Sequence, residues 1–129
     1  MEGSILGFDF GEKRIGVAIG NTMIRQASPL TIVDSRTNDS RWKGIERLVK
    51  EWSPVAFVVG IPSHPDGTPH EMTARCERFA RQLDGRYHLP VFRVDERYSS
   101  VVVESESEAE FIDDEAASVI LQQYFEEER

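Results

Sequence analysis

The sequence has one cysteine, Cys76, and no long run of apolar residues. A single cysteine excludes an internal disulfide bond and a zinc site built from cysteines, and it is typical of a reducing compartment. No segment approaches the ~20 apolar residues that cross a bilayer, and the first apolar run is too short for a signal peptide. We therefore expect a soluble, cytoplasmic protein that keeps Cys76 in its core.

Basic residues are absent from residues 104–128, which contain ten acidic residues. The 129 residues carry a formal charge of −8, from 15 Lys and Arg against 23 Asp and Glu. Residues 1–103 thus hold 13 acidic and 14 basic residues, close to neutrality. The acidity that argues against a nucleic-acid partner therefore belongs to the C-terminal segment alone. The length predicts one domain over residues 1–129.

Two short apolar runs joined by a glycine-containing turn, SILGFDFGEKRIGVAIG, predict a β-hairpin over residues 4–20. Because side chains alternate along a strand, Leu6, Phe8 and Phe10 should face one side of the sheet. Asp9 should then lie on the other face with Ile5 and Gly7. Asp is uncommon inside a sheet, because a buried carboxylate needs a partner or a metal ion.

Two interpretations of Asp9 are open at this point. Its carboxylate accepts hydrogen bonds from the turn between Gly11 and Arg14, or it serves a functional site. The flanking glycines, Gly7 and Gly11, predict open space beside the carboxylate for a ligand.

The remaining pattern predicts an α/β protein. Residues 23–33 form a weak strand whose Pro29 suits a sheet edge. Helical periodicity begins at Ser40, the expected N-cap, and stops at Pro54. Residues 55–61 are continuously apolar, as in a strand covered on both faces. A second helix over residues 71–83, a strand over 91–95 and a helix over 113–127 follow.

Three acidic residues occupy positions that could converge, namely Asp9 inside the first strand, Glu96 at the end of the last strand and Asp113 at the start of the last helix. Asp113 or Asp114 would otherwise cap the last helix. Clustered carboxylates repel one another, and a divalent cation relieves that repulsion. Oxygen ligands favour Mg²⁺ or Mn²⁺, and two such ions about 4 Å apart can activate water against a phosphodiester. The predicted chemistry is hydrolysis of a nucleic-acid backbone.

Five segments also resemble the YqgF (RuvX) family, in that family's order: GFDFGEKRIGVAIG, VVGIPSHPDGT, MTARCERFARQLDGR, VFRVDERYSS and IDDEAASVILQQYFE. The resemblance implies a ribonuclease H-like fold, with a mixed five-stranded sheet of an N-terminal antiparallel hairpin plus parallel strands and helices on both faces. Family members are described as Holliday-junction resolvases and as nucleases that mature the 5′ end of pre-16S ribosomal RNA.

The resemblance also implies roles for particular residues. It implies catalytic and metal-binding roles for the acids Asp9, Glu96 and Asp113. The family's basic residues, which would contact nucleic acid, fall on Lys13, Arg14, Arg75 and Arg97.

Two departures from the family pattern stand out. The segment between Glu96 and the last helix is short and acidic, whereas the family's is often basic. A fourth acid of related resolvases falls on Ala116 here, so either Asp114 takes its place or the site holds one tightly bound ion.

We expect a Mg²⁺- or Mn²⁺-dependent endonuclease that acts on structured nucleic acid, with RNA favoured over DNA, as a monomer or a weak homodimer. The alternatives are a Holliday junction resolvase acting on DNA and a non-catalytic protein that binds nucleic acid, a ribosomal precursor or the transcription machinery. The segment LGFDFG also resembles the phosphate hairpin of actin-like ATPases, but a second phosphate loop of that type is missing.

Overall fold

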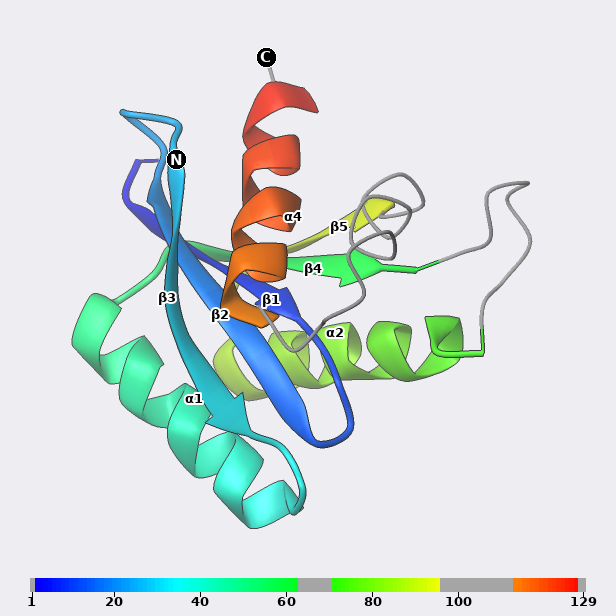
Figure 1. Ribbon diagram of the computed structural model, residues 1–129. Coiled ribbons are helices and arrows are strands. Elements are labelled where there is room, and N and C mark those ends of the chain that lie inside the picture. The colour runs from blue at the N-terminus through cyan, green and yellow to red at the C-terminus, as the bar shows by residue number, and fades with distance from the viewer. Residues whose placement is uncertain (1, 63–70, 96–112, 128–129) are drawn as a thin grey trace.

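The computed structural model describes residues 2–62, 71–95 and 113–127 (Figure 1). Its elements, in chain order, are β1 (Ser4–Asp9), β2 (Arg14–Asn21), β3 (Ala27–Asp34), α1 (Asn38–Trp52), β4 (Ala56–Ile61), α2 (Thr73–Tyr87), β5 (Val91–Asp95) and α4 (Asp113–Glu127). The strands form one sheet in the order β3-β2-β1-β4-β5. β1 pairs antiparallel with β2 and parallel with β4, which confirms the predicted mixed sheet and hairpin.

Helices cover both faces of this sheet (Figure 1). One buried cluster joins Leu6 and Phe8 of β1 to residues of α1 and α2, and the other joins Ile5 of β1 to α4. The predicted alternation of β1 is therefore confirmed. The first cluster is rich in aromatic rings: Phe79 lies 5.5 Å from Phe8 and 5.7 Å from Trp42, between ring centroids. Burial of each large apolar side chain contributes roughly 1.5–3 kcal/mol. Cys76 is buried, as expected.

β3 lies at the sheet edge, as its proline predicts. Pro29 pairs with Ala18 where the register between β2 and β3 shifts. The strand begins at Ala27 rather than at Met23, so the predicted start was wrong. The residues before Ala27 form a turn instead. The Met23 backbone N–H donates to the Asn21 side chain at 2.7 Å, and Arg25 adopts a φ of 60°.

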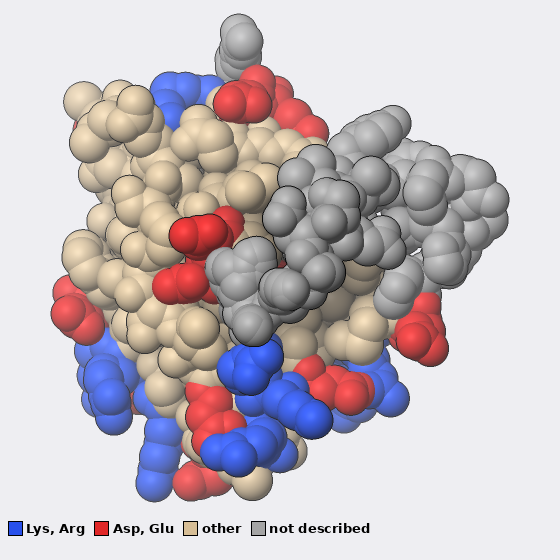
Figure 2. Space-filling model, in the orientation of Figure 1, with Lys and Arg blue, Asp and Glu red and all other residues tan. Residues whose placement is uncertain are grey.

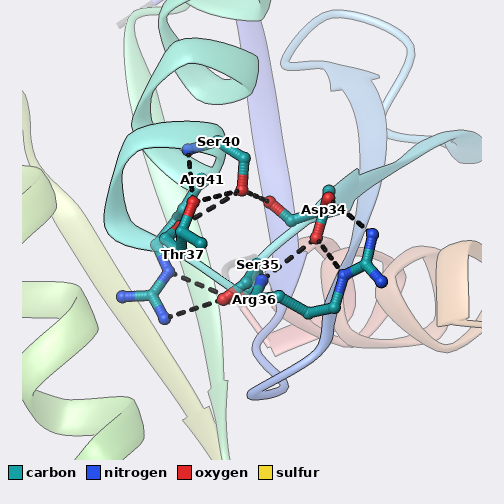
Figure 3. A network of polar contacts seen from close by, with 6 residues as sticks. All are labelled: Asp34, Ser35, Arg36, Thr37, Ser40 and Arg41. Atoms are coloured by element: carbon teal, nitrogen blue, oxygen red, sulfur yellow. Dashed lines mark hydrogen bonds and ion pairs between the residues drawn. The ribbon is translucent and has the colours of Figure 1, made fainter.

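The start of α1 differs from the prediction that Ser40 caps it. Thr37 is the N-cap, and its hydroxyl oxygen accepts a hydrogen bond from the Ser40 backbone N–H at 3.0 Å (Figure 3). The Ser40 hydroxyl instead donates to the Asp34 carbonyl at 3.1 Å. Both residues suit a cap chemically, and the extended backbone of Thr37, with φ −127° and ψ 156°, decides between them.

Asp34, at the end of β3, forms an ion pair with Arg36 at 3.0 Å (Figure 3). Hydrogen bonds from the Arg36 side chain and backbone lower the pKa of the Asp34 carboxyl from 3.8 to about 2. Both side chains are well exposed, so the pair orders the connection to α1 and adds little to stability.

The second helix is longer than predicted at its C-terminus and ends at Tyr87 instead of near Leu83. Gly85 lies within the helix on its exposed face, and a Cβ added there would meet no atom within 4 Å. The helix ends where His88 adopts a φ of 58°. At its start the helix begins at Thr73, two residues later than predicted, and the half-buried Met72 stands at the N-cap.

α4 packs against the sheet at two glycines. A Cβ on Gly7 of β1 would lie 2.9 Å from the Leu121 Cβ, and one on Gly20 of β2 would lie 2.7 Å from the Phe125 ring. These approaches leave no room for a side chain. The helix is also tied to the start of β3, because the Ala27 backbone N–H donates to the Gln122 side chain at 2.9 Å.

We predict that Thr37→Ala lowers the free energy of unfolding by about 1 kcal/mol, because it removes the cap acceptor. Ser40→Ala should cost less, since its hydroxyl does not cap the helix. Urea unfolding followed by circular dichroism compares the two. A larger loss for Ser40→Ala would contradict the cap assignment.

Two alanine substitutions should have opposite effects on stability. Gly7→Ala should destabilise by roughly 1–3 kcal/mol, because the new methyl group meets Leu121. Gly85→Ala should stabilise by roughly 0.5–1 kcal/mol, because nothing lies within 4 Å and alanine favours a helix. Thermal unfolding of both variants measures the difference. Equal effects would mean that α4 does not approach Gly7 this closely.

Candidate active site and arginine hollow

The C-terminal ends of the three parallel strands β1, β4 and β5 lie side by side at one end of the sheet. Phe8 of β1 pairs with Val59 of β4, which pairs with Arg93 of β5. Asp9 is the last residue of β1 and follows Phe8, so by the same register it lies level with Val94, the residue before the last of β5. The expected position of Asp9 inside a sheet is confirmed, although at the end of its strand and half-buried. Glu96 lies outside the described residues and directly follows Asp95, where β5 ends.

The path of α4 brings Asp113 toward the same end of the sheet. Leu121 and the Ala117 carbonyl lie over Gly7, while Phe125 lies over Gly20, which pairs with Ile5. The helix therefore runs antiparallel to β1. From Gly7 to Asp9 the strand advances about 7 Å. From Ala117 back to Asp113 the helix advances about 6 Å. The first residue of α4 thus starts above the end of β1, with Asp114 next to it.

The space predicted beside the two glycines does not exist. Leu121 fills the space next to Gly7, and a Cβ on Gly11 would lie 2.5 Å from the Arg14 carbonyl oxygen. The glycines serve helix packing and the tight turn. A ligand would therefore have to approach Asp9 from the end of the sheet rather than across its face.

The candidate basic residues lie around the same end of the molecule. Lys13 belongs to the hairpin turn and Arg14 starts β2, and both side chains are exposed. Arg75 on α2 is also exposed and forms an ion pair with Glu12 of the hairpin turn. Arg97 lies outside the described residues. In Figure 2 most of the visible Lys and Arg side chains lie at the lower end, interspersed with acidic ones.

A hollow of about 390 Å³, here called the arginine hollow, opens where the hairpin turn meets α1 and α2. Its lining combines guanidinium groups, two aromatic rings and polar side chains: Phe10, Glu12, Asn38, Arg41, Arg75, Arg78, Phe79 and Gln82. Sequence reasoning missed Arg41 here. The spacing of Arg75, Arg78 and Gln82 places polar side chains along one stripe of α2, but it gives no signal for Arg41 on α1.

A metal centre is not complete among the described residues, where no group of three His, Cys, Asp or Glu side chains could hold an ion. Two of the three expected carboxylates do not belong to that set, since Glu96 and the side chain of Asp113 are not described. In the described part of the chain, no helix has the length and apolar character needed to cross a membrane.

Two curated relatives, both named "Putative pre-16S rRNA nuclease", match nearly the whole chain. The protein of Paraburkholderia xenovorans is 53% identical over 128 residues, which cover 95% of this chain and 88% of the relative. The protein of Burkholderia ambifaria is 51% identical over 135 residues, with 98% and 91% covered.

Solved structures of two resolvases share the fold at low identity. RuvC of Thermus thermophilus, solved with a Holliday junction substrate, superposes with a TM-score of 0.57 at 14% identity and covers 95% of this chain and 92% of its own. The fowlpox virus resolvase, solved with Holliday junction DNA, also gives 0.57 at 14% identity, with 96% and 97% covered. The expected ribonuclease H-like fold is therefore confirmed.

A family model described as "RuvX: Holliday junction resolvase" matches residues 3–127. Together with relatives at about half identity over nearly their full length, this match shows that the chain belongs to the RuvX (YqgF) family.

Proposed function

We propose that this protein is a metal-dependent nuclease that hydrolyses phosphodiester bonds of structured nucleic acid, and that its substrate is the 5′ end of pre-16S ribosomal RNA. The observation that carries the proposal is the meeting of the ends of β1 and β5 with the start of α4. These three points bear Asp9, the position before Glu96, and Asp113. The names of the relatives support the choice of RNA.

The proposed ligands fit a hard divalent cation. All three are carboxylates, and oxygen donors are those that Mg²⁺ and Mn²⁺ prefer. A bound cation would activate the attacking water and neutralise charge on the leaving oxygen. Asp9, Glu96 and Asp113 would hold it, and Asp114 is the described acid next to them in α4.

The fold gives Asp9 a rigid support. β1 is hydrogen-bonded to β2 on one side and to β4 on the other, and its flanking residue Phe8 is fully buried. A carboxylate at the end of such a strand keeps a fixed position, and the geometry of in-line displacement requires this.

Phosphate contacts would come from Lys13, Arg14, Arg75 and Arg97. Lys and Arg contacts to phosphates set the register of a nucleic acid without reading its bases. Lys13 and Arg14 are exposed and follow Asp9 closely along the chain, which supports a contact with phosphates near the proposed cleavage site. A cytoplasmic location, and one domain working as a monomer or weak dimer, complete the proposal.

Cleavage of DNA junctions is the second candidate function. The family model is described as a Holliday junction resolvase, and both resolvase structures were solved with a Holliday junction. These descriptions support the second candidate. A resolvase needs a symmetric pair of sites to cut two strands together, whereas an RNA-processing nuclease does not.

We predict that Asp9→Asn lowers cleavage by at least about 10²–10³-fold, because it removes a carboxylate from the site. Its unfolding temperature should stay equal or rise, since the change removes charge repulsion. The assay uses an end-labelled pre-16S 5′ leader and a four-way DNA junction, each with Mg²⁺, Mn²⁺ or EDTA.

Asp39→Asn is the matched control, because Asp39 is an exposed acid on α1 that pairs only with Lys43 at 3.4 Å among the ion pairs described for it. It should cleave at the wild-type rate. The preferred substrate decides between RNA and DNA. Wild-type turnover by Asp9→Asn would refute the mechanism, and no cleavage by folded wild-type protein would favour a non-catalytic binding role.

A further inference from the structure

The arginine hollow has an excess of positive charge. Three of its lining side chains are guanidinium groups, and its one carboxylate, Glu12, is already paired with Arg75. Arg41 and Arg78 therefore face the same small space without a carboxylate of their own among the described lining residues. Two like charges that face one cavity repel each other, and an anion bound between them relieves that repulsion.

Arg41 is held in place for such an anion. Its Nε donates to the Ser35 hydroxyl at 2.9 Å (Figure 3). Its guanidinium also lies 5.1 Å from the centre of the Phe10 ring. Ser35 is itself buried, with 1% of its surface exposed. Partial burial lowers the pKa of the Arg41 guanidinium, and the nearby charge of Arg78 lowers it further. The side chain is thus held by hydrogen bonds and partly removed from water, and it differs in this from a mobile surface arginine.

The floor of the hollow is also rigid. The Phe10 and Phe79 rings lie 4.8 Å apart between centroids, and Phe79 is buried against the core. A preformed site loses little entropy when it binds, because few side chains have to be ordered.

The position of the hollow relates it to the candidate active site. Asp9 and Phe10 are consecutive, and β1 directs alternate residues to opposite faces of the sheet. Asp9 therefore belongs to the α4 side, while Phe10 lies against Phe79 and Arg41 on the α1 and α2 side. A nucleic-acid strand that passes Asp9 at the end of the sheet would reach the arginine hollow by continuing around the hairpin turn.

We infer that the arginine hollow binds a backbone phosphate of the nucleic acid, away from the bond that is cut, through Arg41, Arg78 and Arg75. This inference rests on the proposed function. Guanidinium groups match a phosphate in shape and charge, and Asn38 and Gln82 add polar side chains to the lining. The contact would position the substrate without reading its sequence.

The test measures binding in the Asp9→Asn background, so that cleavage does not interfere. Arg78→Gln is compared with Arg47→Gln, an exposed arginine of α1 that does not line the hollow. The probes are the fluorescent pre-16S 5′ leader and the four-way junction, titrated at several salt concentrations. Arg78→Gln should reduce the slope of log affinity against log salt by roughly 0.7–0.9, the loss of one phosphate contact. Arg47→Gln should leave the slope unchanged.

Arg78→Lys separates charge from shape. It should keep the salt slope and still weaken binding several-fold, because lysine cannot make a bidentate contact. Circular dichroism checks that each variant is folded, and relief of the Arg41–Arg78 repulsion predicts an equal or higher unfolding temperature for Arg78→Gln.

The outcomes distinguish this inference from the proposed function. If wild-type protein cleaves while Arg78→Gln binds with the same salt slope as Arg47→Gln, the hollow is not a phosphate site and the nuclease stands. If Arg78→Gln reduces the slope but wild-type protein never cleaves, the hollow stands and the nuclease fails. Binding of neither probe by folded protein would overturn both.

Discussion

The structure depends on the close contact between α4 and the two glycines of the hairpin. Gly7 and Gly20 let the helix approach the sheet so closely that Leu121 and Phe125 lie against its backbone. This contact buries the second core cluster, which has no other helix among the described residues. It also sets the direction and depth of α4, and with them the place where Asp113 begins the helix. One packing constraint therefore supports both the core and the proposed site.

The two faces of β1 carry the two proposed sites separately. The α4 side carries Asp9 and the start of α4, whereas the α1 and α2 side carries the arginine hollow. The hairpin turn joins them, and Arg75 links α2 to Glu12 of that turn. At the start of α1, Ser35 and Thr37 fix the position of Arg41 and of the first helical turn. The capping of α1 and the proposed phosphate site are thus parts of one connected arrangement.

Much of this fold follows from the sequence, because its periodicity is regular. The alternation of β1, the apolar run of β4 and the helical spacing of α4 predicted their elements correctly. The predictions that were wrong concern features that depend on contacts between residues distant in sequence or on backbone geometry. The space beside Gly7 is filled by Leu121, more than a hundred residues away, and no local pattern reveals that contact. The role of Thr37 depends on its extended backbone, since Ser40 is an equally good cap chemically.

The candidate site was predictable in part. Asp9 stands out because a carboxylate in an apolar strand needs a reason, and its place at the end of β1 agrees with this. Arg41 could not be singled out, because its contacts with Phe10 and Ser35 bring together three separate segments.

The crossing of α4 over β1 also affects the order in which the protein folds. Since α4 follows all five strands in the chain, the proposed carboxylate cluster assembles only through long-range contacts, which form late in folding. During synthesis, a partly made chain would therefore be inert toward the ribosomal RNA around it.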